Sequence, residues 1–334
     1  LQALFEFQSL VCDLTEMELA NASLYDGATS IAEAISVAIN KTKRDNVIIS
    51  EGLHPNNKKV INTLIDKNKF KLDYIELENY IFPENYTFTD NDAAFVVSYP
   101  HFEGTAQDLT TLVSSAKEKG VVTICYVDPT LLGILKTTGN MGFDIVVAEG
   151  QALGVAPTYG GPYVGFFACK ETYMRQMPGR IVGKTRDTQG REGYVLTLQT
   201  REQHIRREKA TSNICTSVGL IALMSTVYMA SQGKQGLRHV AELCYHKAHY
   251  AASLIASLPG YSIPIPGTFF REFVVRCPTS PSSINEQLLN YGILGGLDIN
   301  TLIPNGMLVC VTEMNSRDEI DTFAKALEEI TKTK

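Results

Sequence analysis

The sequence predicts an α/β protein with a mainly parallel, doubly wound sheet, and two observations predict this class. Between residues 46 and 127, short apolar runs alternate with helical stretches, which is the order of parallel strands joined by helices. The runs AAFVVSY and VVTICYV are almost continuously apolar, as expected when helices cover both faces of a sheet. Ligands bind at the carboxyl ends of such strands, where this sequence carries His54, His101 and Asp128.

Each element is predicted from apolar periodicity and from the glycines, prolines and polar residues between segments. We expect helices over residues 1–14, 28–39, 56–67, 106–119, 218–229, 237–258, 283–291 and 318–331. We expect strands over residues 46–50, 71–77, 93–99, 121–127, 144–148, 163–169, 261–265, 270–277 and 307–312, and a hairpin over 180–198. The helix at 218–229 carries no charged residue, so we expect it to be buried.

Glycines at 233 and 236 interrupt the helical pattern. We therefore predict a large domain over residues 1–235 and a small α+β domain over residues 236–334. The chain starts at Leu1, inside an amphipathic helix, and we expect that a further N-terminal segment is missing.

Composition excludes several classes of protein. A net charge of -6 argues against a general nucleic-acid binder. The seven cysteines are scattered without a C-x-x-C pair, which favours buried free thiols in a reducing compartment and argues against a zinc site. No apolar run is long enough to span a membrane, so we expect a cytoplasmic protein without metal.

The most informative stretch runs from Val121 to Cys169. In large α/β enzymes that use pyridoxal phosphate, such a run carries an Asp for the pyridine nitrogen and then a Lys for the Schiff base. Asp128 is present, but no lysine lies between Lys136 and Lys170. The lysine position is occupied by Gln151 or its neighbour Ala152, and neither side chain can form a Schiff base.

Several segments resemble one family closely. They are LQALFEFQSLVCDLT, ANASLYDGATSIAEA, SYPHFEGTAQD, the run from Gly160 to Thr216, and MLVCVTEMNSRDEID. Together they resemble the glycine dehydrogenase (decarboxylating) P-protein family, in particular its α chain, subunit 1 of the two-subunit form. The resemblance implies a fold-type-I pyridoxal-phosphate transferase fold and covers nearly the whole chain.

The resemblance also implies a division of labour. In this family, glycine is decarboxylated on pyridoxal phosphate and its aminomethyl group passes to the lipoyl arm of H-protein. A related β subunit supplies the Schiff-base lysine. We therefore expect that this chain binds no cofactor covalently, is inactive alone, and completes the active site of the β subunit in a heterotetramer.

The remnant of a cofactor pocket is predicted at Gly27, Thr29, His54, Asp128 and Gln151. Gly27 and Thr29 lie in the first turn of a helix and suit a phosphate, or they belong to a helix cap with nothing bound. Asp128 matches the pyridine-binding Asp, or it caps the helix near Thr130. His54 matches a histidine that stacks on the cofactor ring, or it is a turn residue at the end of a strand.

Four further residues are candidates for the subunit contact. His101 lines a site shared with the β subunit or is a neutral surface imidazole. Arg201, Arg206 and Arg207 hold carboxylates or phosphate at the contact, or they belong to a solvated charged face. Lys170 opens a helix, so we expect it to be exposed and not to form a Schiff base.

Two other functions are compatible with the sequence. One is a self-sufficient pyridoxal-phosphate enzyme, such as an aminotransferase or cysteine desulfurase, with a displaced lysine. The other is a structural or regulatory homologue that acts only through protein contacts. A nicotinamide-binding protein is disfavoured, because no G-x-G-x-x-G follows the first strand.

Overall fold

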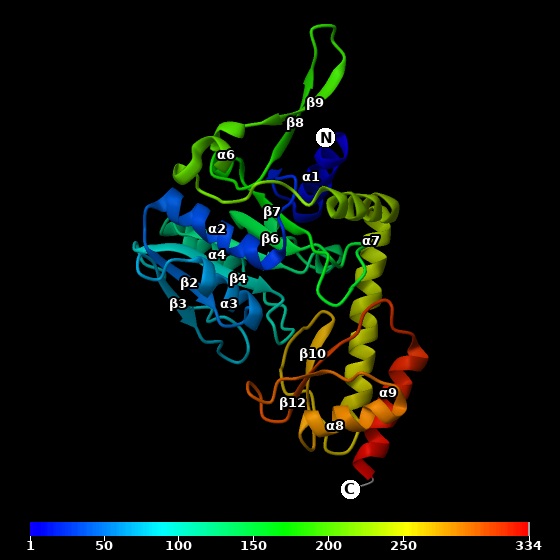
Figure 1. The fold of residues 1–334 in the computed structure, drawn as a ribbon. Helices are drawn as coiled ribbons and strands as arrows, with labels where there is room; N and C mark the ends of the chain where they lie inside the picture. The colour runs from blue at the N-terminus through cyan, green and yellow to red at the C-terminus, as the bar shows by residue number, and fades with distance from the viewer. Residues whose placement is uncertain (333–334) are drawn as a thin grey trace. The chain divides into compact units, whose positions relative to one another are not determined.

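The computed structural model describes residues 1–332, which form two compact units (Figure 1). Unit 1 comprises residues 1–77, 82–99 and 108–237. Unit 2 comprises residues 78–81 and 100–107 and the chain from residue 238 onward. Two short segments from the first third of the sequence therefore belong to unit 2.

Unit 1 is built on a mixed sheet. Among the described residues it has seven strands in the order β1-β7-β6-β5-β4-β2-β3. Their bounds are β1 Leu19–Ala20, β2 Asn46–Ser50, β3 Lys71–Ile75, β4 Asp92–Tyr99, β5 Val122–Val127, β6 Ile145–Glu149 and β7 Gly165–Cys169. Strands β2 to β6 are parallel, whereas β7 and β1 are antiparallel to their neighbours. The predicted parallel α/β sheet is confirmed, with antiparallel strands added at one edge.

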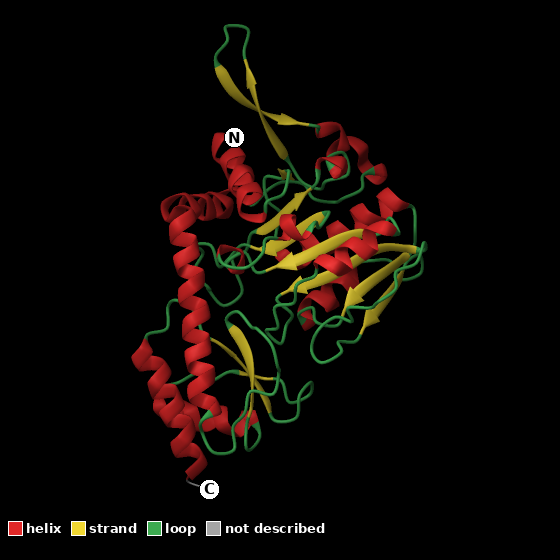
Figure 2. Ribbon diagram, turned by 180° about the vertical axis from the view of Figure 1, so that it is seen from behind, coloured by secondary structure: helices red, strands yellow, loops and turns green. Residues whose placement is uncertain are grey.

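Helices cover this sheet because the strands are apolar on both sides. The helices of unit 1 are α1 Gln2–Thr15, α2 Gly27–Thr42, α3 Pro55–Leu64, α4 Thr110–Glu118, α5 Thr138–Met141 and α6 Gln203–Arg206. Every residue of β4 is buried. Figure 2 shows helices, red, lying beside the strands, yellow. Helix α2 packs across the sheet and buries Ile31 and Ile35 in one core with Val47 and Val96.

A hairpin extends from unit 1. Its strands, β8 Ile181–Arg186 and β9 Glu192–Thr197, pair only with each other (Figure 1). Midway along the hairpin, the ring of Tyr194 contacts Phe5 of α1 with 5.4 Å between ring centroids. The predicted hairpin is confirmed.

Helix α7, Gly219–Ala256, contains the predicted break, because Gly233 has non-helical dihedrals (φ 60°, ψ -178°). The stretch before the break belongs to unit 1 and the stretch from residue 238 belongs to unit 2. The expectation that residues 218–229 are buried is wrong. Four large apolar side chains of this stretch are exposed, namely Leu220, Leu223, Met224 and Val227.

Unit 2 has its own sheet and core. Strands β10 Glu272–Arg276, β12 Gly306–Cys310 and β11 Leu297–Asp298 form an antiparallel sheet in that order. Helices α8 Pro281–Leu288 and α9 Arg317–Lys332 and the second stretch of α7 share one apolar core with it. The strand predicted at 261–265 is wrong: only Ser262 pairs there, in an isolated bridge with Arg276.

Other sequence predictions have simple outcomes. The helix predicted over 106–119 starts at Thr110, because residues up to 107 belong to unit 2 and Asp108 accepts a hydrogen bond from the Thr110 amide. All seven cysteines are free thiols, but the prediction that they are buried is wrong for Cys215 and Cys310, which are exposed, and Cys12 is only half-buried. Over residues 1–332, no helix has the length and apolar character needed to cross a lipid bilayer.

Substitution of Phe95 tests how much the core of unit 1 contributes to stability. Its ring packs against Phe82 and Phe88 at centroid distances of 4.9 and 5.1 Å, and all three side chains are fully buried. We expect Phe95→Ala to lower the free energy of unfolding by about 3–5 kcal/mol. Leu64→Ala, at a side chain 54% exposed, should change it by no more than about 0.5 kcal/mol. Urea unfolding of both variants measures the difference, and equal effects would contradict the assignment of this core.

Candidate functional site

The first turn of α2 lies at the centre of the predicted pocket. Asp26 is the N-cap, and its Oδ1 accepts a hydrogen bond from the Thr29 amide at 2.8 Å. The Thr29 hydroxyl donates to Asp26 Oδ2 at 3.1 Å. The predicted helix start is confirmed, and one of the amides expected to suit a phosphate is bound by a carboxylate of the chain itself.

Glu149, at the end of β6, supplies a second internal carboxylate. Its Oε2 accepts from the Gly27 amide at 2.9 Å, and its Oε1 accepts from the amides of Gln151 and Val164 at 3.0 and 3.1 Å. Burial raises the pKa of Glu149, while these hydrogen bonds act in the opposite direction. A negatively charged group of the protein therefore occupies the position at the helix N-terminus that a bound anion would take.

Packing around Gly27 leaves little additional space. A Cβ at this position would lie 2.8 Å from the Glu149 amide nitrogen and 2.9 Å from Cε2 of Tyr126. Asn57, in the first turn of α3, lies near the Tyr126 side chain. Burial raises the pKa of Tyr126, and the carboxylates of Glu149, Asp128 and Asp26 raise it further. The ends of β5 and β6 and the starts of α2 and α3 thus meet at one place.

The two remaining polar candidates on these elements have local partners. Asp128 Oδ1 accepts from the Thr130 amide at 2.9 Å, just before a short helical turn over 131–133. His54 is the exposed N-cap of α3, and its Nδ1 accepts from the Asn56 amide at 3.1 Å. Both contacts agree with the capping and turn interpretations of these residues.

Gln151, which was predicted to stand at the lysine position, makes hydrogen bonds within its own loop. Its side-chain Nε2 donates to the carbonyl of Pro162 at 3.4 Å, and Ala152 beside it is exposed. Lys170 was expected to be exposed, and this is wrong. Its Nζ donates to Asp144 Oδ1 at 3.0 Å and to the Gly142 carbonyl at 3.1 Å. An ion pair therefore holds this amine next to Asp144, at the start of β6.

His101 belongs to unit 2 and is not a surface residue as one interpretation had it. It is only 2% exposed, and its Nε2 lies 3.2 Å from Gln107 Oε1. Burial lowers the pKa of His101 to about 4, although the hydrogen bond to Gln107 raises it in part. The imidazole is therefore neutral at physiological pH.

The predicted arginines fall into two groups. The guanidinium of Arg201 donates to the backbone carbonyls of Met177 and Gly179, so it holds the loop before β8. Arg206 and Arg207 are exposed at the end of α6. Of the three predicted arginines, Arg206 and Arg207 therefore have solvent-exposed charges.

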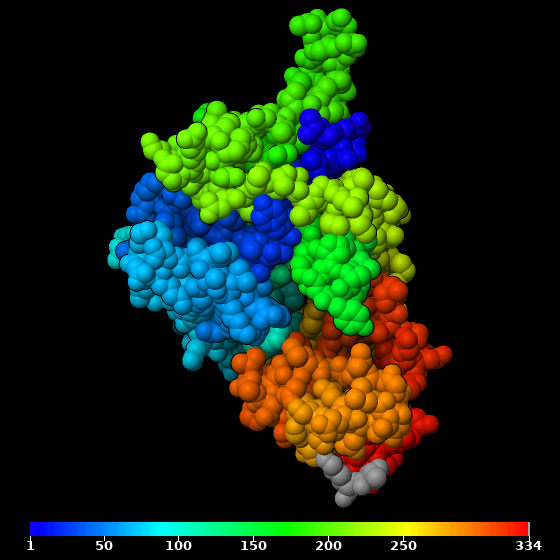
Figure 3. Space-filling model, viewed as in Figure 1, coloured from blue at the N-terminus to red at the C-terminus, as the bar shows by residue number. Residues whose placement is uncertain are grey.

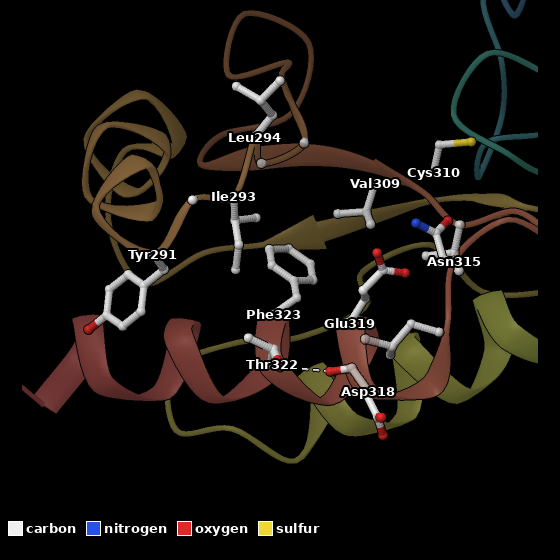
Figure 4. A pocket seen from close by; sticks show the side chains of 15 residues that line it. Tyr291, Ile293, Leu294, Val309, Cys310, Asn315, Asp318, Glu319, Thr322 and Phe323 are labelled. Atoms are coloured by element: carbon white, nitrogen blue, oxygen red, sulfur yellow. Dashed lines mark hydrogen bonds between the residues drawn. The ribbon is translucent and has the colours of Figure 1, made fainter. Parts of the chain in front are cut away.

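Unit 2 contains a separate surface pocket of about 500 Å³ between α9, β12 and the loop over 291–296 (Figure 4). Ile293, Val309 and Phe323 form its apolar floor, and the carboxylates of Asp318 and Glu319 lie on the α9 side. None of the predicted site residues lines this pocket. Among residues 1–332, no cluster of three or more His, Cys, Asp or Glu side chains could hold a metal ion.

Comparison with known proteins identifies the family. The model of the glycine cleavage system P-protein family matches residues 1–327. The chain belongs to the glycine cleavage system P-protein family. A protein of Desulforamulus reducens named "Probable glycine dehydrogenase (decarboxylating) subunit 1" is 48% identical over 98% of this chain and 75% of its own length. A protein of the same name from Thermomicrobium roseum is 45% identical over 99% of this chain and 76% of its own length.

Solved structures agree with this P-protein assignment. An inhibitor-bound glycine decarboxylase (P-protein) superposes with a TM-score of 0.96 at 38% identity, over 99% of this chain and 76% of that one. A NifS-like protein superposes with a TM-score of 0.70 at 16% identity, over the whole chain and 88% of its own, and shows the fold alone. Such neighbours are fold-type-I pyridoxal-phosphate enzymes. The predicted family and fold class are confirmed.

Sequence reasoning missed the roles of Glu149 and Tyr126. Glu149 stood in the sequence as an acidic residue at the end of an apolar strand, which is a signal for a functional or capping carboxylate. Tyr126 lies in β5, two residues before Asp128, which directly follows the strand. Residues two apart point to the same face of a strand. That spacing placed it near the predicted pocket.

The internal carboxylate can be tested directly. Glu149→Ala frees the amides of Gly27, Gln151 and Val164, so inorganic phosphate should bind there and stabilise the variant. At tenfold excess over Kd the gain is about 1.4 kcal/mol, or ~3 °C in Tm. Thermal unfolding with and without phosphate measures it, with Glu192→Ala on the exposed hairpin as the control. Equal stabilisation of the unaltered chain by phosphate would contradict the assignment.

His101 predicts a pH dependence of stability. Its pKa is about 4 in the folded chain against an ordinary value of 6.5, so between these values the unfolded state binds more protons. The contribution of neutral, buried His101 to the free energy of unfolding is fully present above about pH 6.5. It falls as the pH drops toward 4, and about 2 kcal/mol is lost at pH 5.

We expect His101→Gln to remove this part of the loss between pH 7 and pH 5 in urea unfolding. His239→Gln, at an exposed position in the same unit, should keep it. A variant that still loses as much as the unaltered chain would show that His101 is not the group responsible.

Proposed function

We propose that this chain is the cofactor-free α subunit of a glycine decarboxylase and that it acts only with a second subunit that carries the Schiff-base lysine. The overall reaction releases carbon dioxide from glycine and passes the aminomethyl group to lipoyl H-protein. Pyridoxal phosphate, when bound, supplies the electron sink that this decarboxylation needs. In this proposal, the cofactor is held by the partner, and the two kinds of subunit form a heterotetramer.

One observation carries the proposal: the residues of this chain do not fit the cofactor. Gln151 stands where the Schiff-base lysine is expected, and the carboxylate of Glu149 occupies amides at the N-terminus of α2. A phosphate brought to this position would meet that carboxylate, and the two anions would repel each other. In this proposal, the reaction takes place on the partner subunit.

The contribution of this chain is instead a surface for the partner. The names of its relatives, "subunit 1", support the existence of a second subunit. Arg206 and Arg207 are the exposed cations that we assign to the contact, where planar guanidinium groups bind carboxylates or phosphate in pairs of hydrogen bonds. Arg201 instead supports the backbone of the same segment.

A self-sufficient pyridoxal-phosphate enzyme is a weaker proposal. Its displaced lysine would have to reach Asp128, and the nearest lysine after the pocket loop is Lys170. That amine is ion-paired with Asp144 at the opposite end of β6. No observation favours this alternative.

Borohydride trapping separates the two functions. We expect that the purified chain, mixed with pyridoxal phosphate and reduced, carries no stable adduct on a lysine and shows no glycine-dependent carbon dioxide exchange. Added to the lysine-bearing subunit, it should raise the exchange activity by at least about tenfold, a change of about 1.4 kcal/mol in transition-state free energy. Peptide mass spectrometry locates the adduct. A reduced cofactor on this chain, or full activity of the other subunit alone, would overturn the proposal.

A further inference from the structure

The first stretch of α7 exposes large apolar side chains to solvent and buries small and polar ones, unlike an ordinary surface helix. Its inward face consists of Ala222, Ser225, Thr226 and Met229, all at most 5% exposed. Its outward face carries Leu220, Leu223, Met224 and Val227, which are 72%, 41%, 39% and 59% exposed. These four positions follow the spacing of one helix face, so they form a continuous apolar stripe, here called the α7 stripe.

Exposing these apolar side chains to water is energetically unfavourable. A helix on the surface of a lone protein buries its large apolar side chains and exposes its polar ones. Here the hydroxyl of Thr226 lies inside and donates to the Ala222 carbonyl at 2.7 Å, while leucines and a valine face outward. The orientation is explained if the outward face is covered by another protein surface.

Charge supports the same conclusion. Residues 210–233 contain no charged side chain, and the nearest charges on either side are Lys209 and Lys234. A surface that stays in water is normally interrupted by charges, whereas the core of an interface is depleted in them. The complementary surface must therefore be apolar and uncharged.

The area of the α7 stripe suits the centre of an interface. The four side chains expose roughly 400 Å², within the range of about 300–600 Å² that the largest apolar patch on a monomer covers and that is often functional. A stable complex needs about 800 Å² on each partner, so the stripe supplies about half. The neighbouring loop over 150–163 adds two exposed side chains, Tyr159 and Tyr163.

This loop lies directly against the helix. A Cβ on Gly154 would lie 2.5 Å from Cβ of Tyr228, so the loop backbone contacts α7 one residue after the stripe ends. Figure 3 shows the two segments, green and yellow-green, side by side on one face of unit 1. Tyrosines beside an apolar stripe are typical of interface cores.

The segment that leads into the α7 stripe contacts the segment that leads into α2. The chain that leads into α7 is held over the entry of α2, because the Cys215 amide donates to the Tyr25 hydroxyl and the Val218 amide donates to Ser23 Oγ, both at 3.1 Å. A partner seated on the stripe would therefore lie next to the remnant of the cofactor pocket.

We propose that the α7 stripe is the docking surface for the lysine-bearing partner subunit, which meets it with an apolar, uncharged surface. This inference rests on the proposed function, since it takes the partner from there. A second copy of this chain is the other possible occupant, and the experiment separates the two.

The test is association of the full chain with the partner subunit. We expect Leu223→Glu combined with Val227→Glu to weaken the complex by at least about 100-fold, because each substitution buries a charge in an apolar interface. The matched control is Leu64→Glu, at a side chain 54% exposed on α3, which should bind like the unaltered chain. Sedimentation velocity gives the affinities, and circular dichroism of the free chains verifies their folding.

A footprint of the unaltered complex serves as the second measurement. Brief peroxide treatment should oxidise Met224 in the free chain and spare it in the complex. Met314 of unit 2, which is 81% exposed, is the internal reference outside the stripe. This measurement needs no variant and remains decisive even if the double variant fails to fold.

The possible results distinguish failure of the docking proposal from failure of the proposed function. If the unaltered pair is active but the stripe variant binds with unchanged affinity, or Met224 stays as reactive in the complex as in the free chain, the docking proposal is overturned and the proposed function stands. If the chain self-associates through the stripe and binds the partner without it, the surface belongs to a second copy. If the unaltered chain neither binds nor activates the partner, the proposed function fails and the docking proposal with it.

Discussion

The hydrogen bonds from three backbone amides to Glu149 hold the candidate site together. They connect the end of β6, the first turn of α2 and the residue that precedes β7 through a single side chain. Hydrogen bonds to a charged group contribute about 1.5–3 kcal/mol each, while burying a carboxylate costs several kcal/mol. Burial raises the pKa of Glu149 and these hydrogen bonds lower it, with burial the larger of the two effects. Burying the Glu149 carboxylate is unfavourable, but removing it would leave three backbone amides without a hydrogen-bond acceptor.

Close backbone contacts depend on this arrangement and explain two glycines. At Gly165, the first residue of β7, a Cβ would lie 2.4 Å from the Asp26 carbonyl oxygen, so any larger residue would separate the strand from the cap of α2. At Gly27 a Cβ would contact Tyr126 and the amide of Glu149. The first turn of α2 is therefore fixed from two sides. A helix N-terminus fixed in this way has its donors satisfied by the protein and does not require an external anion.

The sequence predicted the elements whose burial is complete and failed where burial depends on what lies outside the chain. Strand β4 was recognisable because residues buried on both faces leave an uninterrupted apolar run. The first stretch of α7 showed a similar lack of charge, and the same rule predicted that it is buried within the chain. Periodicity indicates that a face avoids water, but it does not indicate which protein covers it.

The site residues were predicted less well, for a different reason. Asp128 and the first turn of α2 were placed correctly at the ends of their elements, since strand order determines which ends meet. The partner of the Gly27 amide was not predictable, because its hydrogen bond to Glu149 joins positions more than a hundred residues apart. His101 was predicted to line a shared site or to be a surface imidazole, and the surface interpretation is wrong because the chain passes into unit 2 at residue 100 and buries His101 there. Only the folded chain reveals such pairings.

The internal carboxylate and the reversed helix have a common explanation in the proposed function. A chain that binds its own cofactor must keep amides at a helix N-terminus available for phosphate, and here two carboxylates occupy them. A chain that works alone must turn its large apolar side chains inward, and here four of them face outward. Each arrangement is unfavourable for an independent enzyme, because the first blocks a ligand and the second exposes apolar surface to water. Both become favourable when a second subunit supplies the cofactor and covers the helix, since the apolar surface is then removed from water at about 25 cal/mol per Å².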